Sequence, residues 1–334
     1  MSDGASLPEA IFRSLRTALH EQDLYQVREI AAKQFDDDRA LLREIASARY
    51  IISAMPLAYL GRIRLREETE TIILNETAFS LIRKSYSNLK QKQYEALRRE
   101  MSISQVMISS DELIASAAEY FHVWDASSYR IKGSCRSDLY FDKEYCLEAR
   151  QKLEKEFPAA RGKKVIVYLP MVRYRSTKSG YKYFMNLKYL RSRISDQYVV
   201  AVNVRLPRGE YTQNLNINGF SKVMNGLIAM PQLLCAADVV VGDYRDTFFE
   251  TPLLHKPAFM LTNDSYNFLK NRSTACDFAE AQIGPTIRSE EELAEQLERI
   301  ESYDFTMQDT FRKKYLTYCD GNSARRVVDY IRMH

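Results

Sequence analysis

The chain has 334 residues, of which 46% are hydrophobic, and its 48 basic side chains nearly balance its 44 acidic ones. A net charge of +4 gives no electrostatic argument for nucleic-acid binding, and the hydrophobic content is that of a globular chain with a core. Five cysteines without a CxxC pair predict neither a zinc site nor a disulfide framework, and they favour a reducing, cytosolic setting.

Helices are predicted for residues 7–50, with breaks near 21–23 and 36–38. The first residues lack the apolar core of a signal peptide, and no run of 18 apolar residues could span a membrane. Ile11, Leu15 and Leu19 share one helical face, which favours a helix packed on the protein over one lying on a membrane.

Strands and helices then alternate twice along the chain, which is typical of parallel sheets with crossover helices. In the first alternation we expect strands at 49–54, 70–77 and 104–110, a strand followed by a loop at 129–141, and helices at 79–100 and 111–121. A charged helix and turn at 142–162 is the candidate linker. The second alternation starts at 163–175 with the buried strand VIVYL. It continues with strands at 198–206, 238–243 and 257–262, an irregular segment at 208–226, and helices at 183–194, 231–237 and 289–300, the last with a serine N-cap.

One junction in the second alternation is a candidate ligand site. The apolar run of the 238–243 strand ends at Gly242 and Asp243, a polar turn follows at 244–247, and an apolar helix-like segment begins at Phe248. In open α/β sheets, ligands bind where strand ends meet helix N-termini, which attract anions. A plain connection, capped by Asp246 or Thr247, is the equally balanced alternative.

Five stretches, in this order along the chain, resemble one family: GSCRSDLYF (133–141), KKVIVYLPMVR (163–173), ADVVVGDYRDTFFETPLLHKPAFMLTNDSYNF from 237, IGPTIRSEEEL (283–293) and CDGNSARRVVDYI (319–331). They resemble the CDP-glycerol glycerophosphotransferases, the teichoic-acid primases, polymerases and related capsule enzymes, from about residue 48 to the end.

The resemblance implies an α/β, GT-B-like fold, with two Rossmann-like halves and a helical N-terminal addition. The expected divisions are a helical segment at 1–48, an acceptor-side half at 49–150, and a donor-nucleotide half at 160–334 with a closing C-terminal helix. The implied partners are a nucleotide-activated donor, CDP-glycerol or CDP-ribitol, and a polymer or lipid-linked acceptor. No cofactor, metal or nucleic acid is implied, and the expected location is cytoplasmic, with peripheral contact at the inner face of the plasma membrane.

Both histidines that the family uses are missing. Asn75 stands where the family's general base is expected, and an amide cannot take a proton near pH 7. Glu76 could replace that base if burial raised its pKa. Arg205 is nearest to the place of the second histidine.

Further candidate site residues follow from the resemblance. Arg136 and Asp138 either face the opening between the halves or form a surface ion pair, with Asp138 also a catalytic candidate. Arg173 belongs to a basic loop that either clamps phosphates or is solvated. In the turn, Asp243 and Tyr244 match the family, and Arg245 could bind a phosphate bidentately. Asp246 would repel a phosphate unless it caps the helix or pairs with Arg245, and Thr247 keeps one of the family's hydroxyls.

Two functions remain open from the sequence. The first is a transferase that moves a polyol phosphate or a sugar from a nucleotide-activated donor to a cell-envelope polymer. The second is a catalytically degenerate GT-B protein that serves as a partner, scaffold or glycan-binding subunit. A basic concave site with a positioned base would favour the enzyme.

Overall fold

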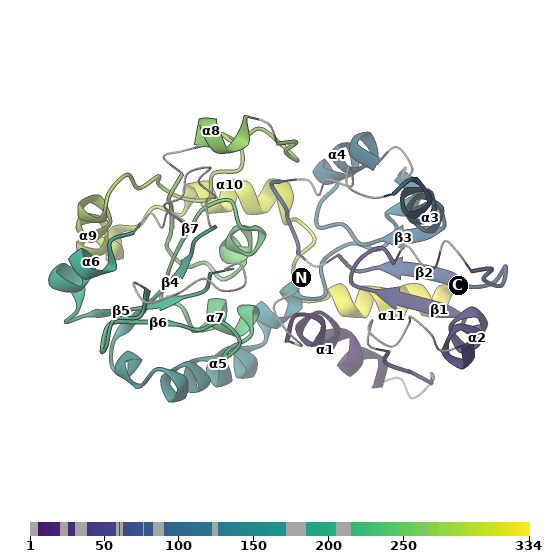
Figure 1. Cartoon of the computed structure of the whole chain (residues 1–334), viewed down its shortest axis with the longest axis horizontal. Helices are drawn as coiled ribbons and strands as arrows, with labels where there is room; N and C mark the ends of the chain where they lie inside the picture. The colour runs from purple at the N-terminus through teal and green to yellow at the C-terminus, as the bar shows by residue number, and fades with distance from the viewer. Residues whose placement is uncertain are drawn as a thin grey trace. The chain divides into compact units, whose positions relative to one another are not determined.

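The computed structural model describes residues 6–20, 26–30, 39–57, 60, 63–75, 77–82, 90–121, 126–171, 185–204, 215–262, 265–270 and 272–334 (Figure 1). The chain divides into two compact units, each of which contains its own parallel sheet. Unit 1 comprises Met1–Ala10, Phe79–Arg83 and Leu139–Leu316, and unit 2 comprises Ile11–Ala78, Lys84–Asp138 and Thr317–His334.

Unit 2 is built on a three-stranded parallel sheet in the order β1-β2-β3. The central strand is the most buried of the three, and its Ile72 and Ile73 are fully buried. The strands are β1 (Tyr50–Ser53), β2 (Glu70–Ile73) and β3 (Ser104–Val106). The helices around them are α2 (Arg39–Ser47), α3 (Gln91–Ser102), α4 (Glu112–Phe121), the 3₁₀ helix η3 (Ala126–Ser128) and α11 (Ser323–Met333); α1 (Ser6–His20) runs from unit 1 into unit 2.

Unit 1 is built on a five-stranded parallel sheet in the order β6-β5-β4-β7-β8. Its strands are β4 (Lys164–Leu169), β5 (Tyr198–Val202), β6 (Ser221–Val223), β7 (Val239–Gly242) and β8 (Ala258–Met260). Its helices are α5 (Lys143–Glu156), α6 (Leu187–Ile194), α7 (Met230–Ala236), α8 (Ser265–Leu269), α9 (Glu290–Glu298) and α10 (Thr306–Tyr315), with 3₁₀ helices η4 (Ser137–Phe141, which begins in unit 2), η5 (Pro158–Ala160), η7 (Asp246–Leu253) and η8 (Ile300–Ser302).

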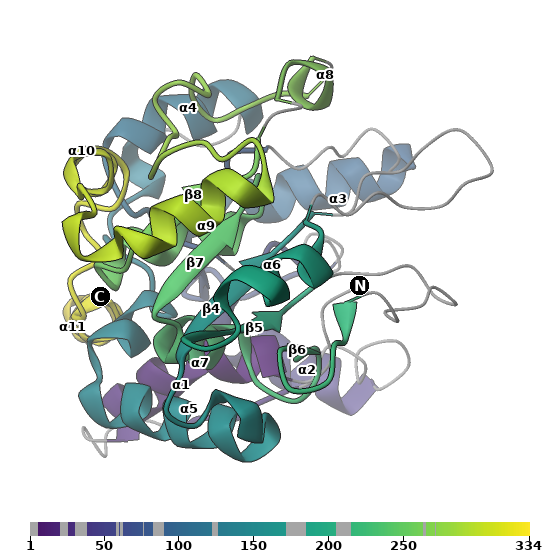
Figure 2. The same ribbon diagram turned by 90° about the vertical axis from the view of Figure 1, so that its left-hand side faces the viewer.

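Apart from the exposed Lys164 at the start of β4, the central strands β4, β5 and β7 of unit 1 are buried along their length, because both faces of the sheet are covered. Ile166 and Tyr168 belong to one hydrophobic core with residues of α6 and α9. Figure 2 shows these two helices on one face of the sheet. Val165 and Val167, on the opposite face, are fully buried as well. Period-2 alternation is therefore absent, and the strand is read from its continuous apolar run.

The strand order of unit 1 contains a topological switch point. From β4 the chain continues to β5 and β6 on one side, and it then returns to place β7 against the other side of β4. Successive crossovers therefore leave in opposite directions at the carboxyl ends of β4 and β7. In open α/β sheets this is the place where ligands bind.

The expected α/β fold is confirmed, with a parallel sheet in each alternation. The strand expected at the start of 129–141 is wrong, since Lys132 forms only an isolated bridge with Ile108, and the loop expected after it contains the 3₁₀ helix η4. The edge strand β6 lies within the segment 208–226 that we expected to be irregular. Ser289 caps α9 as predicted, accepting a hydrogen bond from the Glu292 N–H.

The two units do not coincide with the ranges 1–48, 49–150 and 160–334. Helix α5, the expected linker, packs against α7 within unit 1, so the change of unit comes at 138/139. The closing helix α11 belongs to unit 2, where its N-terminus is held by Asp138. Among the described residues, no helix has both the length and the apolarity to cross a membrane.

Candidate functional site

Asp243 joins the two strands that flank the switch point of unit 1. It follows β7 directly, and its Oδ2 accepts a hydrogen bond of 2.8 Å from the backbone N–H of Met171, which follows β4. Its side chain is buried, with 1% exposed. The carboxylate therefore fixes how the two chain segments leave the sheet at the place where a ligand is expected.

Gly242 makes the sharp turn after β7 possible. A Cβ atom at this position would lie 2.5 Å from the ring of Phe248, which packs back against the end of the strand. The buried Phe248 and Phe249 anchor η7 beneath the turn. Only glycine fits this close approach, which is why the apolar run ends in it.

Arg245 points into the protein. Its Nη1 donates to the backbone oxygen of Asn203 and, at 3.0 Å, to the Asn203 Oδ1, and only 6% of Arg245 is exposed. Asn203 follows β5, so the guanidinium links the ends of β5 and β7. The predicted bidentate contact of Arg245 with a phosphate would compete with these hydrogen bonds.

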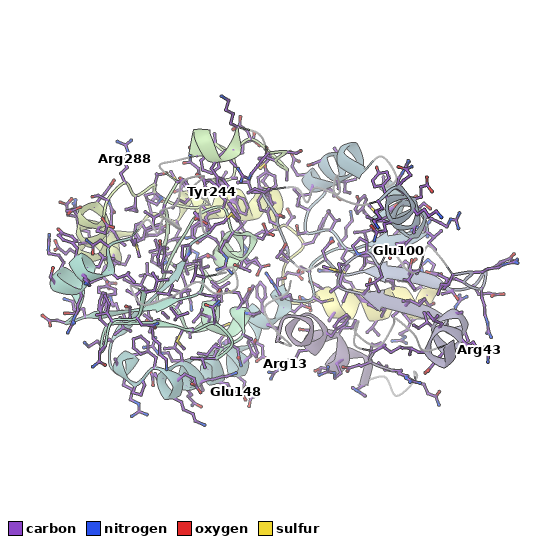
Figure 3. The ribbon with its side chains drawn as sticks, in the orientation of Figure 1. Arg13, Arg43, Glu100, Glu148, Tyr244 and Arg288 are labelled. Carbon is purple, nitrogen blue, oxygen red and sulfur yellow. The ribbon has the colours of Figure 1, made fainter. Side chains whose placement is uncertain are left out.

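Tyr244 is fully buried in unit 1 (Figure 3). Its ring stacks on Phe268, with centroids 4.3 Å apart and planes 9° apart, and its hydroxyl donates to the Thr262 backbone oxygen at 3.5 Å. The guanidinium of Arg272 lies 3.9 Å from the centroid of the Phe268 ring. Tyr244 thus fixes the turn against the segments that follow β8.

The segment after the turn is a 3₁₀ helix, and its start differs from the predicted cap. Arg245 occupies the N-cap position without a side-chain cap, and the Asp246 Oδ1 accepts a 2.8 Å hydrogen bond from the Ser80 hydroxyl. Thr247 is 8% exposed, and its buried Oγ1 has no hydrogen-bond partner among the described residues. Since a buried hydroxyl normally finds a partner, Thr247 marks a vacant hydrogen-bonding position at the start of η7.

Asp138 lies in unit 2 and caps a helix. Its Oδ1 accepts from the Ser323 N–H at 3.1 Å and its Oδ2 from the Ala324 N–H at 2.8 Å, at the N-terminus of α11. Burial raises the pKa of this carboxyl, although these hydrogen bonds oppose the rise. The sequence contained both partners, in the stretches 133–141 and 319–331, but nothing in it showed that the stretches meet.

Gly133 and Ser134 also contact the start of α11. Gly133 has φ +120°, and a Cβ there would lie 2.4 Å from the Ser323 Oγ. The Ser134 N–H donates to the same Oγ at 3.0 Å. Arg136 is 1% exposed, so it is no part of a surface ion pair. Of the positions that matched the family here, Gly133 and Asp138 lie against the N-terminus of α11.

Asn75 follows the central strand of unit 2 in the left-handed region, with φ +60°. Its Nδ2 donates to the Met107 backbone oxygen at 2.6 Å, which joins the ends of β2 and β3. Asparagine tolerates this backbone conformation better than most residues. Glu76, Arg173 and Arg205 lie outside the described residues.

One buried carboxylate was absent from the predicted site. Glu250, in η7, is fully buried and accepts a hydrogen bond from the Tyr140 hydroxyl. Its place a few residues after the candidate turn could have pointed to it, but nothing in the sequence showed that its side chain is buried. The described residues contain no group of three or more His, Cys, Asp or Glu side chains that could hold a metal ion.

Curated relatives cover most of this chain. A teichoic acid poly(ribitol-phosphate) polymerase of Bacillus spizizenii is 24% identical over 306 residues, which are 88% of this chain and 49% of the relative. The teichoic acid ribitol-phosphate polymerase TarK of Staphylococcus aureus is 24% identical over 279 residues, which are 82% of this chain and 54% of the relative. The chain thus spans about half the length of the curated relatives it matches.

Solved structures agree on the fold. The wall teichoic acid polymerase TagF superposes with a TM-score of 0.72 at 17% identity, covering 96% of this chain and 84% of that one. This likeness shows a GT-B-like fold. The family model for CDP-glycerol:poly(glycerophosphate) glycerophosphotransferase matches residues 8–333. Because this match spans nearly the whole sequence, the chain belongs to the CDP-glycerol:poly(glycerophosphate) glycerophosphotransferase family.

Proposed function

We propose that this protein is a transferase that moves glycerol phosphate or ribitol phosphate from a CDP-linked donor to a cell-envelope polymer. The family supports this reaction class. Relatives named as polymerases and primases of both ribitol phosphate and glycerol phosphate support the two candidate donors.

The observation that carries the proposal is the Thr247 hydroxyl at the switch point of unit 1. It is buried and has no hydrogen-bond partner among the described residues, and it stands at the first turn of η7. The N–H groups at a helix start favour anions. A donor diphosphate placed here would accept hydrogen bonds from the Thr247 hydroxyl and from these N–H groups, while Asp243 and Tyr244 hold the turn in place.

In the proposed reaction, an acceptor hydroxyl oxygen attacks the β-phosphorus of the donor. The bond from that phosphorus to the bridging oxygen breaks, and CMP leaves with the oxygen. The acceptor's proton passes to a base, for which Glu76 is our candidate. Hydrogen-bond donors at the start of η7 would stabilise the charge that develops on the leaving phosphate.

The geometry of Asn75 favours a second candidate function. Its amide is held by the Met107 carbonyl and its backbone lies in the left-handed region, so this position serves the fold. A chain that binds the donor without transferring it would be a catalytically degenerate partner or glycan-binding subunit. Retained binding of CDP ligands fits both functions, whereas release of CMP fits only the transferase.

The acceptor is proposed to be a polymer or a lipid-linked chain presented at the inner face of the plasma membrane. Peripheral contact there is supported by the net charge of +4 and by the exposed Arg13 of α1 (Figure 3). Leu15 and Leu19 of this helix are buried, so the contact would be electrostatic. Anionic lipid surfaces attract basic segments of this kind.

The test combines ligand binding with product release. Purified protein is melted with CDP, CMP, UDP, GDP, ADP, CDP-glycerol and CDP-ribitol, and a ligand at 100 times its dissociation constant should add about 2.7 kcal/mol of stability. Thr247→Val, which keeps the shape but loses the hydroxyl, should lose most of the response, and Thr247→Ser should keep it.

Release of CMP from CDP-glycerol or CDP-ribitol is then measured with an acceptor polymer. Cytidine-selective binding with CMP release supports the transferase. Binding without CMP release supports the degenerate partner. A well-folded protein that responds to no nucleotide, or a Thr247→Val variant that binds like the parent, contradicts the proposed site.

A further inference from the structure

Two cysteines from different helices meet inside unit 1. Cys146 lies in the first turn of α5 and Cys235 in the last turn of α7, two helices that pack side by side (Figures 1 and 2). Their Sγ atoms are 2.8 Å apart although the residues are 89 positions apart in the sequence, and both are free thiols. The function proposed above assigns no role to either of them.

We propose that Cys146 and Cys235 form a reversible disulfide when the protein meets a mild oxidant such as a peroxide. Their sulfurs are less than about 1 Å beyond the S–S bond length of about 2.05 Å, so little movement of the helices is needed. The packing of α5 on α7 holds this arrangement in the reduced protein. The site is therefore preformed in the fold.

The surroundings of the pair assign different roles to the two sulfurs. Cys146 is half-buried, so an oxidant can reach it, whereas Cys235 is 7% exposed. The hydrogen bond with the Cys235 thiol and the nearby Lys256 ammonium lower the pKa of Cys146. Position in the first turn of a helix also favours a thiolate. Cys146 is thus the attacking sulfur and Cys235 the resolving one.

Lys256 is held in place beside the pair. Its Nζ donates hydrogen bonds to the backbone oxygens of Leu234, at 3.1 Å, and Cys235, at the end of α7. These carbonyls fix the ammonium group near the two sulfurs. A positive charge in this position stabilises the thiolate form, which is the form that reacts.

The chemistry balances with hydrogen peroxide as the oxidant. The Cys146 thiolate attacks one peroxide oxygen, the O–O bond breaks, and hydroxide leaves, which gives a sulfenic acid on Cys146. The Cys235 sulfur then attacks the Cys146 sulfur, the S–O bond breaks, and water leaves. Two thiols and one peroxide become one disulfide and two waters, and dithiothreitol reverses the product by thiol exchange.

The test is made on the full chain. Reduced protein is treated with hydrogen peroxide, remaining thiols are blocked with N-ethylmaleimide, and the peptides are identified by mass spectrometry. We expect one cross-linked pair, Cys146–Cys235, with a loss of two hydrogens in the intact mass and a rise in melting temperature, both reversed by dithiothreitol. The matched control is Cys276→Ser, since Cys276 is also half-buried but lies beside Tyr315 and Glu280 instead of the pair. It should cross-link at the parent rate.

Two serine variants test the roles of the sulfurs. Cys235→Ser should accumulate sulfenic acid on Cys146, trapped with dimedone, while Cys146→Ser should give neither a cross-link nor a trapped Cys235. Circular dichroism confirms that each variant is folded. The proposal is overturned if the peroxide-treated parent keeps both thiols free for N-ethylmaleimide, or if the cross-link joins other cysteines. Dimedone on Cys235 in the Cys146→Ser variant would overturn the assigned roles.

Discussion

Removing the carboxylate of Asp138 should detach the C-terminal helix rather than stop a reaction. Both of its oxygens accept N–H groups of α11, from Ser323 and Ala324, and these two residues are 0% and 4% exposed. Asp138→Ala leaves two buried N–H groups without acceptors, at about 1–3 kcal/mol each, so we expect a loss of about 3–4 kcal/mol. Asp138→Asn keeps one acceptor and should lose about half as much.

The measurement must be local, because a chain with two compact units need not unfold in one step. Hydrogen exchange read by mass spectrometry on peptides from 317–334 reports directly on α11. Asp142 supplies the matched control, since it caps α5 through the Tyr145 N–H but is exposed. Asp142→Ala should cost about 1 kcal/mol and leave the exchange of 317–334 unchanged.

The opposite pattern would refute this reasoning. If amide hydrogen exchange over 317–334 and the urea midpoint were the same in Asp138→Ala as in the parent, the Asp138 cap would not stabilise α11. If that variant also lost CMP release completely, Asp138 would act in the chemistry, as the resemblance suggested from the sequence.

Three further predictions test the packing within each unit. Burial raises the pKa of Glu100 from 4.5 to about 7, so the folded state binds this proton more tightly than the unfolded state (Figure 3). The unfolding free energy should therefore fall by about 3 kcal/mol as pH rises from about 4.5 through about 7. The urea midpoint of the parent should fall over this pH range, and the midpoint of Glu100→Gln should fall less, because the variant lacks this titrating group. Gly133→Ala should cost about 2–3 kcal/mol because its Cβ would lie 2.4 Å from the Ser323 Oγ, whereas Gly162→Ala, with open space around its Cβ, should cost about 1 kcal/mol in the same thermal melts. Arg245→Met should cost about 2 kcal/mol because the buried Asn203 oxygens lose their donor, and an unchanged melt would contradict the buried link.

The sequence by itself determined the α/β architecture and the position of most strands along the chain. After Lys164, β4 is a run of buried Val, Ile, Tyr and Leu, and β7 is three valines and a glycine, because each strand is buried on both faces. This signal needs no knowledge of neighbouring strands. The Ser289 cap was equally readable, since a cap and its N–H partner lie three residues apart. Family membership also followed from the order of five short stretches.

The apolar pattern predicted the wrong backbone structure where buried side chains lie outside regular helices and strands. Tyr129 and Ile131 are buried, and their apolar spacing predicted a strand, but the segment reaches the core as an irregular chain with one bridge. An apolar pattern reports that side chains are buried. It does not report that the backbone joins a ladder.

The roles of the candidate site residues were decided only by tertiary structure. Asp138 meets Ser323 across 185 positions, and Arg245 meets Asn203 across 42, so neither hydrogen bond leaves a trace in local sequence. Both residues matched or replaced family positions that suggested ligand contacts, and both are used by the fold. Thr247 differs because its hydroxyl is buried without a partner among the described residues. A sequence supplies the polar groups of a site, but only the packed chain determines which hydrogen-bonding positions the protein itself fills.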